Sequence, residues 1–444
     1  MQPVIDRQLQ QFAHLVEQAR TASRFRRVGT VVEVSGLTIV ARGPVAKIGE
    51  LCALQPDDDN DPIYAQVVAF RENRTILLSL GSLQGVEPGC HVIGTGRQLQ
   101  IGTGPQMLGR VIDCFGRPLD DKGPIPVQSH RSLENAPPPP LKRRRITEPL
   151  WVGVRAIDGL LTCCQGQRLG IFSGAGVGKS MLLGMIARNS SADVNIIALV
   201  GERGREVLDF LERDLGEGIA KSVVVVTTSD QPPLLQVHTG LAATAIAEYF
   251  RDQGANVLLL MDSLTRLARA QREVGLAAGE IPTTGGYPPS LYTMLPKLLE
   301  RAGATQQGTI TGLYTVLVEQ DDIYDPVGDA ASAILDGHIV LSRQLAVAGH
   351  YPAIDITRSV SRLMNDVVTP DHRRAAVQFR SLVAAHNEVQ DLIEVGAYTR
   401  GSDPRVDRAL ELRTEMNRFL QQPPEEYTAP EHTRRWLQRL MTTR

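Results

Sequence analysis

The stretch that decides the fold of the central part of the chain is RLGIFSGAGVGKSMLLGMIAR, residues 168–188. The apolar run RLGIF is followed by the loop SGAGVGKS, Ser173 to Ser180, and then by an apolar helical pattern. Glycines let a backbone turn tightly and point N–H groups at one spot, and the next helix adds its positive end. This order predicts a phosphate-binding loop in which Lys179 reaches phosphate and the Ser180 hydroxyl holds Mg²⁺.

One position departs from the strict loop pattern G-x-x-x-x-G-K-[ST], because its first residue here is Ser173. The alternative is a glycine-rich turn that only caps an ordinary helix. Strand, loop and G-K-S coincide in the right order, which favours phosphate binding. The candidate nucleotide-binding residues are Gly174, Ala175, Gly176, Val177, Gly178, Lys179, Ser180 and Met181.

Composition limits the class of protein. The 444 residues exceed one domain, and 42% hydrophobic with 22% charged residues is ordinary for a chain with packed cores. A net charge of −2 argues against nucleic-acid binding through bulk charge. Five cysteines without a C-x-x-C pair indicate reduced thiols in a cytosolic protein, and the adjacent Cys163 and Cys164 are expected to be small buried residues. No signal peptide and no apolar run of about 18 residues is found.

The chain divides into four pieces: 1–26, a helix that binds a partner; 27–97, a small closed β-barrel; 98–370, an α/β ATPase domain with a leading linker; and 371–444, a helical domain. Residues 5–24 repeat apolar side chains at helical spacing, typical either of packing on the protein itself or of docking a partner. Short β-branched runs over 28–95 predict the barrel. NAPPPPLKRRRITEP, from Asn135, is a stiff linker whose basic cluster Lys142–Arg145 is compatible with nucleic acid or acidic lipid but more typical of a solvated segment.

From about 150 to 370, apolar runs alternate with helical stretches. The runs are RLGIF, NIIALVG, SVVVVTT, NVLLLMD, ITGLYTVL and GHIVLS. Continuous apolar runs predict a parallel sheet covered on both faces, with its ligands at the carboxyl ends of the strands. Residues 371–444 predict helices interrupted at GAYTRGSDP.

Two carboxylates follow predicted strands. NVLLLMD ends at Asp262, which is expected to hold Mg²⁺ through water, although DSLTR also resembles a helix N-cap and both roles are compatible. Glu202, in IIALVGERGREV, is placed to orient a water molecule and take its proton. Arg203 and Arg205 are placed either to steady phosphate oxygens or to pair with Glu206, and the alternative for the whole group is a surface ion-pair cluster.

Two further candidates follow the last predicted strand of the sheet, GHIVLS. Tyr351 precedes Pro352 in a loop and is either an adenine-stacking aromatic or an ordinary packing residue. Arg362 lies outside every predicted strand. It is either a surface residue or a finger for a neighbouring subunit's γ-phosphate.

Together with these residues, several longer motifs make the chain resemble a known family. They are GRVIDCFGRPLDDKGP, ITEPLWVGVRAIDGLLT, SGAGVGKSMLLGMIARN, GERGREV, LLLMDSLTRLARAQREVGLAAGE, GYPPSLYTMLPKLLERAG, ILDGHIVLSRQLAVAGHYPAIDI, SVSRLM and GAYTRGSDP, which span roughly residues 28–415. The sequence resembles the catalytic subunits of rotary ATP synthases and, more closely, the type III protein-export ATPases. Within these, the flagellum-specific members are most similar.

The resemblance implies a β-barrel, a RecA-like P-loop ATPase core and a helical C-terminal domain, assembled as a homohexamer with ATP and Mg²⁺ between subunits. It also implies residue roles. Lys179 and Ser180 would bind phosphate and Mg²⁺, Glu202 would be the catalytic carboxylate, Asp262 the Walker B acid, Arg203 the arginine beside the γ-phosphate, Arg362 the finger acting in trans, and Tyr351 the adenine-stacking aromatic.

The expected function is ATP hydrolysis that energises type III export of flagellar proteins. The implied partners are a stator-like regulator on the first helix, a central stalk-like export protein, the export gate, export substrates and chaperones, at the inner face of the cytoplasmic membrane and without nucleic acid. The alternatives are a virulence injectisome ATPase, a rotary synthase catalytic subunit and a hexameric RNA translocase. GERGREVLDF and SDQPPLL favour the flagellar system. The sequence shows no acidic lever of a synthase and few barrel aromatics for single strands.

Overall fold

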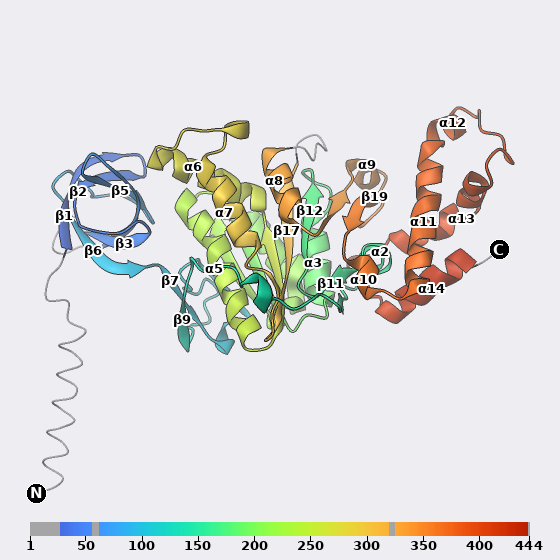
Figure 1. Cartoon of the computed structure of the whole chain (residues 1–444), viewed down its shortest axis with the longest axis horizontal. Coiled ribbons are helices and arrows are strands. Elements are labelled where there is room, and N and C mark those ends of the chain that lie inside the picture. Colours follow the sequence, from blue (N-terminus) through green and yellow to red (C-terminus); the bar gives the residue numbers. More distant parts are fainter. Residues whose placement is uncertain (1–26, 56–61, 319–324, 443–444) are drawn as a thin grey trace, which may run out of the picture. The chain divides into compact units, whose positions relative to one another are not determined.

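The computed structural model describes residues 27–55, 62–318 and 325–442, which form two compact units divided between Leu99 and Gln100 (Figure 1). The helix expected over residues 5–24, with its partner-binding role, lies outside the described residues. Each unit is described by itself.

The first unit is a closed six-stranded barrel. Its strand order is β1 (Arg27–Ser35), β2 (Thr38–Arg42), β5 (Arg74–Ser79), β4 (Ile63–Arg71), β3 (Glu50–Gln55) and β6 (His91–Gln98), with all neighbours antiparallel. Small and β-branched side chains such as Val31, Ile39 and Val67 alternate inward and fill the barrel. The predicted β-barrel is confirmed.

The second unit is built on a nine-stranded sheet. Its order is β19 (Ile354–Ser361), β18 (Gly337–Leu341), β12 (Arg168–Ser173), β17 (Thr309–Leu317), β15 (Asn256–Asp262), β13 (Val194–Glu202), β14 (Ser222–Thr228) and β8 (Arg110–Ile112), with β16 (Gly303–Ala304) beside β17. The strands from β18 to β8 run parallel, and β19 and β16 pair antiparallel. Every residue of β13 is buried, as expected for a strand covered on both faces. The predicted parallel sheet is confirmed.

Helices cover both faces of the sheet (Figure 1). The helices between β10 and α11 are α2 (Arg155–Leu160), α3 (Lys179–Asn189), α4 (Gly204–Asp209), α5 (Pro233–Asp252), α6 (Leu264–Ala278), α7 (Pro289–Leu299), α8 (Pro326–Ile334), α9 (Arg343–Val347) and α10 (Met364–Val367). Short strand pairs flank the sheet: β7 (Gln100–Thr103) with β9 (Ser129–Ser132), and β10 (Pro149–Leu150) with β11 (Cys163–Cys164). Strand register sets the carboxyl ends of the parallel strands at one edge, because Ser173 pairs with Leu317 and Leu341, and Leu199 with Asp262.

The C-terminal part is helical, as predicted: α11 (Pro370–Glu388), α12 (Gln390–Glu394), α13 (Pro404–Leu420) and α14 (Pro430–Thr442) (Figure 1). The predicted break GAYTRGSDP separates α12 from α13. Pro404 opens α13, and Asp403 caps it by accepting the Arg405 N–H at 2.8 Å. The rings of Phe379, Phe419 and Trp436 pack together between these helices.

A buried arginine ties the helical part to the sheet domain. The Arg155 guanidinium, on α2, donates to the carbonyls of Phe419 and Gln421, to the Glu426 carboxylate and to the Thr428 hydroxyl. Its guanidinium also lies 5.1 Å from the centre of the Trp436 ring. With its charge and donors satisfied in the interior, Arg155 joins α2 to the segment between α13 and α14.

All five cysteines of the chain are free and buried. Burial raises the pKa of Cys52, Cys114 and Cys164 to about 12 and that of Cys163 well above its usual value. These four thiols are therefore protonated at neutral pH and lack the thiolate that reacts with electrophiles. Cys163 and Cys164 are the small buried residues that the sequence predicted.

Within the described ranges, no helix combines the length and the apolar character that a membrane span requires.

A buried ion pair gives the first prediction. Glu248 on α5 holds Arg301 through two hydrogen bonds of 2.8 and 2.9 Å, and both side chains are at most 2% exposed. Glu248→Gln is expected to lower the free energy of unfolding by about 3 kcal/mol, because it leaves a buried guanidinium without its counter-charge. Glu415→Gln, which breaks the exposed pair with Arg418, should change stability by less than about 0.5 kcal/mol. Calorimetry of both variants measures this, and equal melting temperatures would contradict it.

Candidate active site

The loop between β12 and α3 has the geometry of an anion cradle. β12 ends at the buried Ser173, and α3 begins at Lys179 with Ser180 in its first turn. Gly176 and Gly178 have φ values of 75° and 88°, which favour glycine. Among the described residues, nothing lies within 4 Å of a Cβ built at Gly176, so the loop is open there. The backbone N–H groups and the helix start therefore offer a site for phosphate.

Lys179 lies between two carboxylates from neighbouring strand ends. Its Nζ donates to Asp262 Oδ1 and lies 3.8 Å from Glu202 Oε1. Thr315, on β17, donates its hydroxyl to Asp262 Oδ1 at 2.7 Å. These side chains are buried or nearly so, which strengthens their electrostatic interaction. The structure thus brings together Lys179, Glu202 and Asp262.

Glu202 has the environment of a tuned acid–base group. Burial, a hydrogen bond shared with Glu206 and the negative charge of Asp262 raise the pKa of Glu202 to about 8, against the opposing charges of Lys179 and Arg266. Its Oε2 accepts from Arg266 Nη2 at 2.9 Å. Its Oε1 is buried without a hydrogen-bond partner among the described residues, so it can accept from a water molecule or substrate. A base titrating near neutral pH is suited to proton transfer.

Sequence reasoning missed two residues of this cluster. Arg266 contacts both Glu202 and the carbonyl of Gly201, and Thr315 orients Asp262. For Arg266, a signal was present in DSLTR, since a residue in the first turn of a helix that follows a strand lies near the strand ends. Thr315 is a buried residue inside β17 and gave no such signal.

The donor set fits Mg²⁺ only together with phosphate oxygens. Among the described residues, no group of three or more His, Cys, Asp or Glu side chains converges on a common point. Ser180 and Asp262 lie at the loop and at the end of β15, and they supply the oxygen ligands that Mg²⁺ prefers. Magnesium at dedicated nucleotide sites is usually held by few protein ligands, water and substrate phosphates, which matches this arrangement.

Tyr351 lies over the phosphate loop. A Cβ built at Gly178 would be 3.1 Å from Tyr351 Cε1 and 3.4 Å from Met181 Cε, so these side chains meet at the loop. The Tyr351 carbonyl accepts the Gln422 N–H at 2.9 Å, which connects it to the segment after α13. The aromatic ring is thus placed beside the loop, where a planar base can stack.

Two predicted arginines lie apart from this cluster. Arg203 is 77% exposed and pairs with Glu206 at 3.7 Å, the ion pair that the sequence left as an alternative. Arg362 is exposed, directly follows β19, and donates its N–H to the Asp336 carbonyl. Ser361 pairs with Gly337 at the start of β18, so Arg362 lies at the amino edge of the parallel strands. The loop lies at the opposite edge, across the six residues of β12, roughly 17 Å.

Three family models match the chain. They are the beta-barrel domain of the ATP synthase alpha/beta family over residues 31–96, the nucleotide-binding domain of that family over 153–361, and the T3SS EscN ATPase C-terminal domain over 368–439.

Individual proteins match over nearly the full length. The flagellum-specific ATP synthase of Bacillus subtilis is 49% identical, covering 93% of this chain and 94% of that protein. The type 3 secretion system ATPase of Xanthomonas euvesicatoria is 48% identical, covering 92% of each. The assembled ATPase EscN, solved with its central stalk EscO from the enteropathogenic E. coli type III secretion system, superposes with a TM-score of 0.86 at 46% identity, covering 93% of this chain and all of EscN.

Proposed function

The chain belongs to the ATP synthase alpha/beta family, in its branch of type III export ATPases, and on this premise we propose how its site hydrolyses ATP and which export system it serves. The observation that carries the mechanism is the buried cluster of Lys179, Asp262 and Glu202 beside an open phosphate loop. A cation for phosphate, a carboxylate for Mg²⁺ and a second carboxylate for water are the parts that phosphoryl transfer to water requires.

Glu202 is the residue that activates water. Its free Oε1 accepts a proton from the attacking water, while Arg266 holds Oε2 and fixes the orientation of the carboxylate. The raised pKa of about 8 makes Glu202 a stronger base than an exposed glutamate. Burial, the hydrogen bond with Glu206 and the charge of Asp262 maintain this pKa.

The loop and its neighbours bind the nucleotide. Backbone N–H groups of residues 174–178 and the Lys179 ammonium bind the phosphates, Ser180 and Asp262 hold Mg²⁺, and Tyr351 stacks on adenine. Bound Mg²⁺ neutralises charge on the phosphates. Arg203, now paired with Glu206 at the surface, is proposed to turn toward the γ-phosphate.

Arg362 acts on a neighbouring subunit. It lies at the sheet edge opposite its own loop, so one chain cannot bring Arg362 and Lys179 to the same phosphate. We therefore propose a homohexamer in which each site combines the loop of one subunit with Arg362 of the next. Because EscN was solved with its central stalk EscO, a central stalk-like export protein is proposed to fit this ring.

We propose the remaining partners from the resemblance of the sequence to the export ATPases. A stator-like regulator binds residues 1–26, and the export gate, substrates and chaperones meet the protein at the inner face of the cytoplasmic membrane. Flagellar and injectisome relatives are almost equally identical to this chain. We propose the flagellar system on GERGREVLDF and SDQPPLL, with the injectisome as the second candidate.

An export assay distinguishes the two systems. Replacing the chromosomal copy with Glu202→Gln is expected to abolish secreted flagellin and filaments and to leave any injectisome effectors unchanged. Glu217→Gln changes an exposed glutamate outside the cluster, so it is the matched control and should export normally. Loss of effectors alone would assign the injectisome, and unchanged export of both would contradict the export function.

A further inference from the structure

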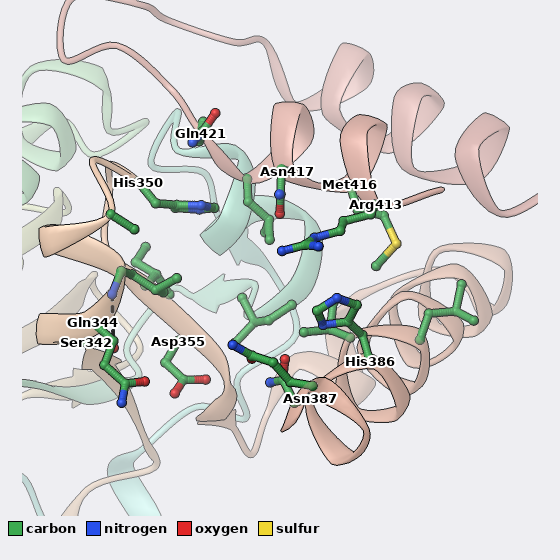
Figure 2. A pocket seen from close by; sticks show the side chains of 18 of the residues that line it. Ser342, Gln344, His350, Asp355, His386, Asn387, Arg413, Met416, Asn417 and Gln421 are labelled. Atoms are coloured by element: carbon green, nitrogen blue, oxygen red, sulfur yellow. Dashed lines mark hydrogen bonds between the residues drawn. The ribbon is translucent and has the colours of Figure 1, made fainter. Parts of the chain in front are cut away.

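A cavity lies away from the phosphate loop. It has a volume of about 540 Å³ and separates the faces of α11 and α13 from the segment that runs from Ser342 to Ile356 (Figure 2). Sites for small molecules have volumes of roughly 300–1,000 Å³. None of its lining residues belongs to the loop 173–181, and Tyr351 is not among them.

Two histidines and one arginine line this cavity from opposite walls. His350 extends from the segment after α9, while Arg413 on α13 and His386 on α11 extend from the helical wall (Figure 2). Figure 2 shows the His350 ring and the Arg413 guanidinium turned toward each other across the space. Apolar side chains such as Leu345 and Leu382 complete the walls.

Polar atoms of all three side chains lack partners among the described residues, although His386 also forms a side-chain hydrogen bond with Asn387. His350 is only 7% exposed, and its Nε2 has no hydrogen-bond partner there. The Nε2 of His386 is also buried without one, and Arg413 forms no ion pair within the described ranges. A buried polar atom without a partner costs about 1–3 kcal/mol. A ligand that accepts hydrogen bonds from these groups would recover that free energy.

One cation and one anion line the cavity, and only the cation lacks a partner among the described residues. Arg413 contributes a positive charge that, after burial, also lowers the pKa of His386. The one carboxylate among the lining residues is Asp355. Its Oδ1 accepts from the N–H and hydroxyl of Thr357 and from the N–H of Arg358, at 2.6 to 3.1 Å, so donors of its own turn already stabilise its negative charge, whereas the charge of Arg413 has no such partner among the described residues.

We propose that this cavity binds a small organic anion, with its charged group at Arg413, His350 and His386 and its apolar body against the leucine side chains. The Arg413 fork suits a planar carboxylate or a phosphate ester, and the neutral imidazoles donate or accept according to their tautomers.

Two chain segments, one from each wall of the cavity, connect it to the proposed nucleotide site. His350 precedes Tyr351, and Gln421, which lines the cavity, precedes Gln422, whose N–H bonds the Tyr351 carbonyl. An anion that fixes these two segments would therefore change nucleotide affinity, and by reciprocity nucleotide would change the affinity for the anion. This coupling rests on the proposed nucleotide site, whereas anion binding itself does not.

Titration calorimetry on the full chain tests the proposal by measuring the affinity for two probes that have the same shape but differ in charge. Naphthalene-2-carboxylate is expected to bind at least about tenfold more tightly than naphthalene-2-carboxamide, because only the carboxylate carries charge. Arg413→Gln should weaken carboxylate binding at least about tenfold and leave the carboxamide unchanged. Arg418→Gln removes a charge from the same helix outside this cavity and should bind like the original chain.

A blocking variant locates the site. Ala348 is exposed and lines the cavity, so Ala348→Trp should fill its entrance without disturbing the core and should abolish binding of both probes. Circular dichroism confirms that each variant is folded. Equal binding of the two probes, undiminished binding by Arg413→Gln or Ala348→Trp, or no binding to the original chain would overturn the proposal. None of these results depends on ATP hydrolysis.

Discussion

Arg362→Ala is expected to slow ATP hydrolysis by the assembled protein about 10³–10⁵-fold, the effect measured where arginine fingers are removed. Nucleotide binding to the isolated chain should not change, because Arg362 lies at the opposite edge of the sheet from its own loop. Steady-state phosphate release and equilibrium binding of a fluorescent ATP analogue measure the two properties separately.

A mixing experiment tests whether Arg362 acts between subunits. Lys179→Ala chains lack a working loop but retain Arg362, and Arg362→Ala chains retain the loop. Each variant alone should be inactive. Mixed rings should recover part of the activity, because some sites then pair an intact loop with an intact Arg362 from the neighbour.

The result distinguishes an Arg362 that acts on a neighbouring subunit from one that acts on the loop of its own chain. If Arg362 served the loop of its own chain, every site in the mixture would still lack one group and no activity would return. Arg373→Ala removes another exposed arginine, on α11, and should hydrolyse ATP at the original rate. Normal turnover in Arg362→Ala rings would exclude the finger role.

Glu202→Gln is expected to reduce kcat about 10²–10⁴-fold, the range contributed by a positioned general base. The amide keeps nearly the shape of the carboxylate but cannot take a proton from water. ATP affinity should stay within about threefold, because in this mechanism Lys179, Ser180 and Asp262 bind the phosphates and Mg²⁺. Single-turnover kinetics separates binding from chemistry.

The same substitution should stabilise the fold at alkaline pH. The Glu202 pKa lies near 8 in the folded chain and near 4.5 unfolded, so the folded state binds more protons between these values. Stability is thus lost as pH rises from about 4.5 to 8. Glu202→Gln has no such titration and should be more stable than the original chain by on the order of 1–3 kcal/mol at pH 8, and by little at pH 5.

Melting curves at both pH values check this, with Glu217→Gln as a control that should follow the original chain. A Glu202→Gln variant that hydrolyses ATP normally would remove the general-base role. A variant with the same pH-dependent stability as the original chain would show that Glu202 is not buried as a protonatable group.

Much of the fold could be predicted because its elements carry local signals. Alternating short runs predicted the barrel, and continuous apolar runs such as NVLLLMD predicted strands covered on both faces. The antiparallel direction of β19 could not be predicted, because IDITRSVS differs little from a parallel strand and pairing is set by tertiary contacts.

The residues of the candidate site also differ in whether local sequence patterns predict them. Lys179 and Asp262 belong to local patterns, a loop and a strand end, and the structure places them in contact. Arg266 and Thr315 depend on which strands are neighbours, so their contacts follow from the sheet order β17–β15–β13. The edge of the sheet at which Arg362 lies, at the amino ends of the parallel strands, likewise follows only from the direction of β19.

The burial of all five cysteines has a practical consequence. Because none is at the surface, a single cysteine introduced at an exposed position would be the one thiol open to maleimide dyes, without removing the native ones. One donor and one acceptor dye on adjacent subunits would then report the distance between them by energy transfer. Opening and closing of individual rings could be followed in real time during turnover.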